Sequence, residues 1–145
     1  MKQTVILSIR GTQTYLDQEP DVIELVTEGT MESFGTGCWS LSYEESDLTG
    51  LSGVTTTFQI EPDKITLTRT GRLNSVMVFQ EGVFHDSLYQ MEFGALLITV
   101  CAEKISANMD MDGGVVDLTY GIEIEQSSAG VIDYHLEVRP KTNAY

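Results

Sequence analysis

The sequence contains little cysteine and histidine, which argues against most metal and disulfide chemistry. Its 145 residues include two cysteines and two histidines. Cys38 and Cys101 have no C-x-x-C spacing and no histidine beside them, so we expect two reduced thiols rather than a zinc site or a disulfide. We also expect no metal and no cofactor, because the chain lacks a phosphate-binding loop, a nucleophile elbow and a calcium loop.

Basic side chains are also few, and this disfavours negatively charged partners. Eight lysines and arginines stand against 22 aspartates and glutamates, which gives a formal net charge of −14. Residues 11–63 hold eleven acidic side chains and no lysine or arginine. Such a surface repels phosphate backbones and anionic lipid headgroups, so we expect no nucleic acid partner and no membrane partner. The acidic groups most simply keep the protein soluble, and a docking face for a basic partner is the alternative.

Long apolar runs are missing as well. No stretch approaches the roughly 20 apolar residues that a membrane-crossing helix needs. The N-terminal MKQTVILSIRG has one lysine before a short apolar run, which Ser8 and Arg10 interrupt. This pattern predicts a strand rather than a signal peptide, so we expect a cytoplasmic protein.

What the chain does have is alternation of apolar and polar residues, which is typical of strands with one buried face. Ten segments show it, at about residues 4–10, 21–32, 38–44, 54–61, 64–70, 74–80, 83–92, 95–107, 116–125 and 131–139. Segment 95–107 could also form a helix, but its consecutive Ile98, Thr99 and Val100 favour a strand.

The connections between these segments are short and rich in glycine, so neighbouring strands should pair antiparallel. Many strands without helices must stack as a sandwich or close as a barrel. Closure removes the exposed sheet edges, and sequential hairpins favour an up-and-down order. We therefore predict an all-β fold, a single domain over residues 1–145 that forms an antiparallel up-and-down β-barrel of about eight to ten strands.

In the threonine-rich stretch from Gly53 to Gly71, the alternation shows which residues belong to each face of the predicted sheet. Most of its six threonines fall out of phase with the apolar residues and should face water. Arg69 instead continues the apolar face of Ile65 and Leu67. A charge on that face must be paired or must reach water, because its desolvation is costly. Arg69 could extend to solvent, pair with a carboxylate such as Glu44, or bind an anionic ligand.

Three further polar residues, Glu44, His85 and Tyr89, are candidates for a site. The alternation points Glu44 toward solvent and leaves open which way His85 and Tyr89 face. Glu44 alternates out of phase with Trp39, Leu41 and Tyr43, so it faces solvent unless a bulge turns it inward. His85 and Tyr89 share one face, whichever way the hairpin at Glu81-Gly82 is built. A structural role for His85 is favoured over acid–base chemistry.

Several segments together resemble a known bacterial family. They are IELVTEG (residues 23–29), LSYEESDLTGLSGVTTTFQI (41–60), RTGRLNSVMVFQEG (69–82), then His85, Tyr89, Phe93-Gly94, and DMDGGVVDLTYGIEI (110–124). The combination is similar to the YwiB-like β-barrel family. The resemblance implies a calycin-type, lipocalin-like barrel of cytoplasmic bacterial proteins whose biochemical role is not established.

These observations predict a protein that is not an enzyme and that binds a small apolar or anionic molecule at one mouth of the barrel. The polar candidates are Arg69, His85, Tyr89 and Glu44, and the expected walls are Trp39, Tyr43, Phe58, Met77 and Phe79. An interaction module with an acidic docking face is the second hypothesis. An enzyme using His85 and a carboxylate is the third, and the lack of any triad-like or metal-like grouping disfavours it.

Overall fold

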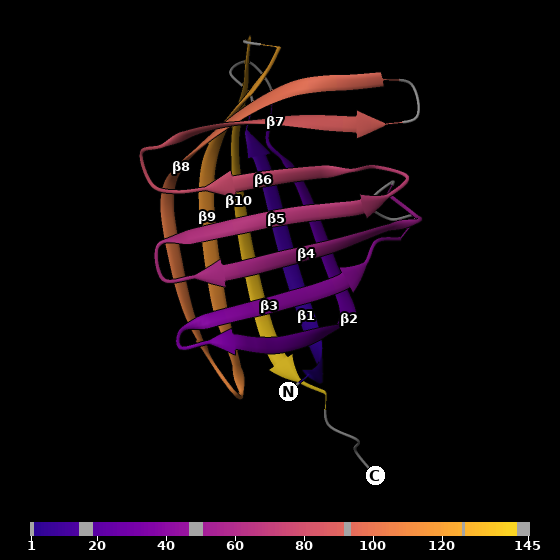
Figure 1. Cartoon of the computed structure of the whole chain (residues 1–145), viewed down its shortest axis with the longest axis vertical. Helices are drawn as coiled ribbons and strands as arrows, with labels where there is room; N and C mark the ends of the chain where they lie inside the picture. The colour runs from indigo at the N-terminus through magenta and orange to yellow at the C-terminus, as the bar shows by residue number, and fades with distance from the viewer. Residues whose placement is uncertain (1, 15–18, 47–50, 92–93, 126, 142–145) are drawn as a thin grey trace.

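The part of the chain that the structure describes folds into ten β-strands, as the alternation predicts. The structure, a computed structural model, describes residues 2–14, 19–46, 51–91, 94–125 and 127–141. The strands are β1 (Lys2–Thr14), β2 (Asp21–Gly35), β3 (Cys38–Glu44), β4 (Val54–Glu61), β5 (Lys64–Gly71), β6 (Ser75–Phe79), β7 (Phe84–Met91), β8 (Gly94–Asp110), β9 (Gly113–Ile124) and β10 (Ser127–Pro140) (Figure 1). The segment that could have been a helix lies within β8, so its prediction as a strand is confirmed.

The strands form one antiparallel sheet that curves into a nearly closed barrel. Its order is β6-β5-β4-β3-β2-β1-β10-β9-β8-β7, so strands that follow each other in the chain are neighbours in space. The first and last strands of the chain join the two halves of this sheet, because β1 pairs with β10 over Val5 to Thr14. The predicted all-β, up-and-down barrel is therefore confirmed, with ten strands among the described residues.

The barrel is incomplete at a seam between β6 and β7. Short turns were expected to pair all neighbouring strands, but in the described chain these two meet only at isolated bridges, Asn74 with Gln90 and Gln80 with Val83. The connecting turn folds toward β8 instead, where Gly82 N donates to Ala102 O at 2.9 Å. Here β8 shifts register, and its Ile105 N donates to Glu81 Oε2 at 2.8 Å. The turn between β6 and β7 thus contacts β8 next to its register shift.

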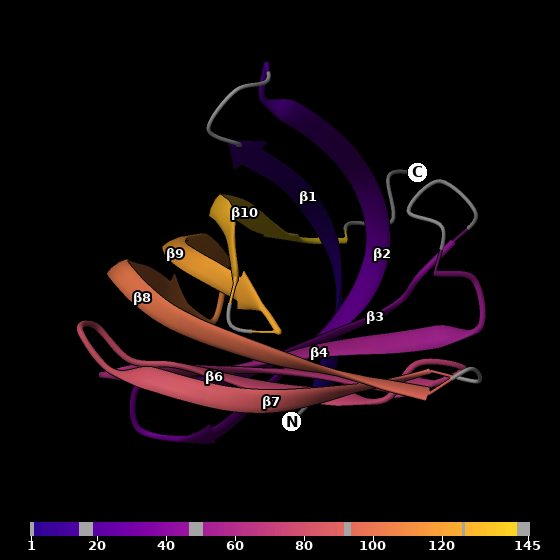
Figure 2. The ribbon, with the colours of Figure 1, turned by 90° about the horizontal axis from the view of Figure 1, so that it is seen from above.

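Two crossing layers give the barrel its shape. In Figure 1, β3 to β7 run across β1, β2, β8, β9 and β10, and in Figure 2 the second group curves over the first. The long strands β2 and β8 belong to both layers, since β2 pairs with β1 and with β3, and β8 pairs with β7 and with β9. Gly29 permits the tight approach of β2 to β3, because a Cβ there would lie 2.5 Å from Ser42 O.

Inward side chains of both layers fill most of the barrel. The largest fully buried ones include Leu7, Met31, Leu41, Phe58, Ile65, Phe79 and Leu118. Cys38 and Cys101 are free, half-buried thiols. In the described part of the chain, no helix is long and apolar enough to span a bilayer.

Candidate functional site

A cavity of about 240 Å³ lies at one end of the barrel. Its walls come from the C-terminal halves of β1, β3 and β5, the N-terminal half of β2 and the middle of β10, together with Glu45 and Leu51 between β3 and β4. Ile9, Leu25 and Ile132 supply apolar surface. Asp21, Tyr43, Glu45, Arg69 and Tyr134 supply polar groups. The cavity thus combines an apolar wall with a small set of polar side chains, a composition common to small-molecule sites.

Arg69 is the cation of this cavity, and it is 8% exposed. It continues the inward face of Ile65 and Leu67, as the alternation predicts. Its cross-strand neighbours are Thr56 on β4 and Ser75 on β6. Arg69 Nε is buried and has no hydrogen-bond partner among the described residues. A buried guanidinium with an unpaired N–H group indicates a polar site rather than an apolar core.

Tyrosines surround the guanidinium. Burial opposes the charge of Arg69, yet electrostatic interaction with Tyr134, Tyr89 and Tyr120 and a hydrogen bond with Tyr134 raise its pKa above the ordinary value. Arg69 is therefore charged at any physiological pH. Burial also raises the pKa of Tyr120 well above its ordinary value. Tyr120 is consequently a neutral phenol, which can both donate and accept hydrogen bonds.

The position of Tyr134 depends on a glycine and two rings. Gly11 stands opposite Tyr134 in the β1–β10 ladder, and a Cβ at Gly11 would lie 3.3 Å from the tyrosine ring. The ring also packs edge-on against Phe58 at 6.1 Å and lies 6.3 Å from the ring of Tyr120. These contacts hold the Tyr134 side chain at the cavity wall.

A buried carboxylate faces the same cavity. Glu45 is 8% exposed, and its Oε2 accepts a hydrogen bond from Thr56 Oγ1 at 2.5 Å. Burial, together with the charge and hydrogen bond of Glu45, raises the pKa of Tyr43 far above its ordinary value, so this phenol is neutral. Glu45 was missed in the sequence, although it continues the inward phase of Leu41 and Tyr43.

The structure separates several residues that the sequence placed together. Glu44 is exposed on the outer face opposite Thr55, so it is not placed to pair with Arg69, and the bulge that would turn it inward does not occur. Trp39 lies toward the other end of the barrel, because it is the second residue of β3 whereas Tyr43 is close to the end of that strand. There it lines a second hollow of about 350 Å³ with Ile60 and Met109.

The remaining predicted residues lie inside the barrel but do not line the cavity. Phe58, Met77 and Phe79 fill the core, and the ring of Phe79 lies 4.4 Å from that of Tyr120. His85 shares the inward face with Tyr89, and His85 Nε2 lies 2.8 Å from Gln80 Oε1. That hydrogen bond gives His85 a structural partner, while Tyr89 lies close enough to Arg69 to influence its pKa.

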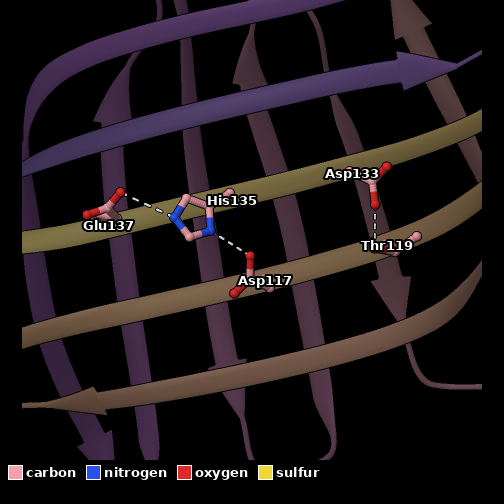
Figure 3. A network of polar contacts seen from close by, with 5 residues as sticks. All are labelled: Asp117, Thr119, Asp133, His135 and Glu137. Atoms are coloured by element: carbon pink, nitrogen blue, oxygen red, sulfur yellow. Dashed lines mark hydrogen bonds and ion pairs between the residues drawn. The ribbon is translucent and has the colours of Figure 1, made fainter. Parts of the chain in front are cut away.

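A second polar network occupies the outer face of β9 and β10 (Figure 3). His135 Nδ1 lies 2.6 Å from Asp117 Oδ1, and His135 Nε2 lies 3.2 Å from Glu137 Oε2. Hydrogen bonding to Asp117 raises the pKa of His135 above its ordinary value, and Glu137 adds to the effect. The network is on the solvent side of the sheet and does not reach the cavity. Within the described residues, no cluster of histidine, cysteine and acidic side chains is arranged to hold a metal ion.

Comparisons with known proteins support the fold and assign no activity. A family model described as a domain of unknown function (DUF1934) matches residues 7–138. The solved structure of the ywiB protein from Bacillus subtilis is similar, with a TM-score of 0.84 and 20% sequence identity. The match covers 97% of this chain and 94% of that one. A search of curated proteins finds no match.

Proposed function

The chain belongs to the DUF1934 family of domains of unknown function, and we propose from the geometry of its cavity that it binds a small organic molecule through an acidic group. One observation carries the proposal: among the described residues that line the cavity, Arg69 is the sole cation, and it is buried. Guanidinium groups bind carboxylates and phosphates through paired N–H donors. An acidic group that enters the cavity would meet this charge beside the neutral phenol of Tyr43 and the hydroxyl of Tyr134.

The polar interior around Arg69 supports the proposal. Arg69 Nε, Ser75 Oγ and Ser87 Oγ are all buried without a hydrogen-bond partner among the described residues. Each such group costs about 1–3 kcal/mol when it stays unpaired. Arg69 is the one of the three that lines the cavity, so its unpaired Nε is better explained by a role in binding than by packing.

The size of the cavity limits the ligand. Its volume of about 240 Å³ is below the roughly 300–1,000 Å³ of sites for drug-sized molecules. The ligand is therefore a small metabolite with a short apolar body, which Ile9, Leu25 and Ile132 would contact. Barrels of similar strand number hold one small ligand in other proteins, which is an analogy of fold and not of sequence.

Thermal unfolding in the presence of candidate ligands tests the proposal. The panel contains small carboxylic acids, including hydroxy and amino acids, together with inorganic phosphate. A ligand at one hundred times its Kd stabilises the folded state by about 2.7 kcal/mol, which corresponds to a rise in Tm of ~5–10 °C for a domain of this size. Isothermal titration then measures the Kd of each compound that raises the Tm.

Arg69→Met is the decisive variant, and Arg10→Met is its matched control because Arg10 is exposed on the outer face of β1. Loss of a charge-assisted hydrogen bond should weaken binding about 10- to 100-fold in Arg69→Met and leave it unchanged in Arg10→Met. If no compound raises the Tm, or if both variants bind as the wild type does, the cavity is not the binding site. The acidic outer surface would then be the better hypothesis.

A further inference from the structure

We propose that the ligand of this cavity is a small zwitterion, with its carboxylate at Arg69 and its ammonium group at Glu45 and Asp21. The inference rests on the proposed function and names the chemical class of the ligand. It follows from the charges that line the cavity, from their separation on the barrel wall, and from the groups that lie between them.

The charges of the cavity do not suit a simple anion. Arg69 supplies one positive charge, while Glu45 and Asp21 supply two negative charges. A ligand with only a carboxylate would be attracted to Arg69 and repelled by both acids, most strongly by the buried and poorly screened Glu45. An ammonium group on the same ligand turns both repulsions into attractions, and Glu45 attracts it in addition to its hydrogen bonds with Thr56 and Tyr43.

The strand register separates the two ends of the site. Tyr43 on β3 pairs with Thr56 on β4, and Thr56 pairs with Arg69 on β5. The backbones of β3 and β5 are therefore two strand spacings apart, or about 10 Å. Glu45 follows Tyr43 on the same inward face, and Thr56 Oγ1 holds its carboxylate. A ligand must bridge part of this separation to contact both charges.

The groups between the charges fit the body of such a ligand. Ile9, Leu25 and Ile132 provide an apolar wall for a short chain of methylene groups. Tyr43 is a neutral phenol that is hydrogen-bonded to Glu45, so its oxygen can accept a hydrogen bond from an ammonium group held at Glu45. Asp21 is exposed and Glu45 is buried. The ammonium end can therefore enter past Asp21 before it reaches Glu45.

A series of linear ω-amino acids tests the inference and measures the spacing. Glycine, 3-aminopropanoate, 4-aminobutanoate and 6-aminohexanoate are titrated into the protein by calorimetry, beside the alkanoates of equal length and the corresponding alkylamines. We expect one amino acid of the series to bind at least tenfold more tightly than its matched alkanoate and its matched amine. The preferred chain length then reports the distance between the carboxylate at Arg69 and the ammonium group at Glu45.

Variants assign the two ends. In Glu45→Gln, the affinity for the amino acid should exceed that for the alkanoate by less than threefold. Glu44 is the exposed neighbour, and the variant Glu44→Gln should bind as the wild type does. If Glu45→Gln lowers the Tm of the ligand-free protein too far for titration, Asp21→Asn at the rim should reduce the same advantage.

Two outcomes overturn the inference, and they differ in what they mean for the proposed function. Alkanoates that bind as tightly as amino acids, with unchanged or tighter binding in Glu45→Gln and Asp21→Asn, would overturn the zwitterion and leave Arg69-dependent binding of an acid intact. If no amino acid and no alkanoate binds in a way that depends on Arg69, both proposals are wrong.

Discussion

Thr56 and Glu45 form a buried hydrogen bond, which predicts a coupling free energy between substitutions of the two residues. Thr56 is 0% exposed, and its hydroxyl donates to the Glu45 carboxylate at 2.5 Å. A hydrogen bond to a charged group contributes about 1.5–3 kcal/mol, and a buried hydroxyl left without an acceptor costs about 1–3 kcal/mol. We therefore expect Thr56→Val and Glu45→Met each to lower the free energy of unfolding by about 1–3 kcal/mol.

The double variant separates this bond from other effects of the two substitutions. Replacing both partners with apolar groups leaves neither the hydroxyl nor the carboxylate stranded, so the double variant should lose less than the sum of the single losses. We expect a coupling of about 1–3 kcal/mol, measured by urea unfolding at neutral pH with unchanged m-values. Glu44→Met is the matched control, because Glu44 is exposed and pairs with Thr55 rather than Thr56. It should change stability by about 0.5 kcal/mol or less. It should also be additive with Thr56→Val.

Additivity of Thr56→Val and Glu45→Met within about 0.5 kcal/mol would refute the reasoning, because independent sites add to that precision. It would mean that the hydroxyl of Thr56 does not hold the carboxylate of Glu45. The cavity would then lack the fixed negative charge on which the zwitterion proposal depends. A coupling of equal size between Thr56→Val and Glu44→Met would contradict the assignment of faces along β3.

Two further predictions test the barrel outside the cavity. Gly29→Ala should lower the free energy of unfolding in urea by about 1–3 kcal/mol, because its Cβ would lie 2.5 Å from Ser42 O. Gly121→Ala is the control and should be neutral or stabilising, because the space around its Cβ is open. Equal losses in the two variants would contradict the close approach of β2 to β3. The hydrogen bond to Asp117 is the main cause of the raised pKa of His135 in the folded state. The charged His135 therefore stabilises the fold fully below the unfolded pKa of about 6.5. This stabilisation is lost as the pH rises through the folded pKa. His135→Gln should therefore destabilise near pH 6 and have no such effect near pH 9, and a loss of equal size at both values would exclude the charged form as the cause.

The period-two alternation of the sequence determined the strands and their faces. It is a local property, because successive side chains of a strand point to opposite sides whatever the strand pairs with. This is why the inward position of Arg69 and the outward position of Glu44 followed from their phase with Leu67 and Tyr43. The same rule applied to Glu45 would have found the buried carboxylate.

Only the tertiary structure decided which inward residues share one level of the barrel. Tyr134 lies far from Arg69 in the sequence, and the two are brought together by closure of β1 onto β10. Register shifts, such as the one between Ala102 and Lys104 in β8, also displace one strand along its neighbour without changing the alternation on which sequence reasoning depends. Alternation specifies a face, whereas the position of a side chain along the barrel depends on every register around the ring.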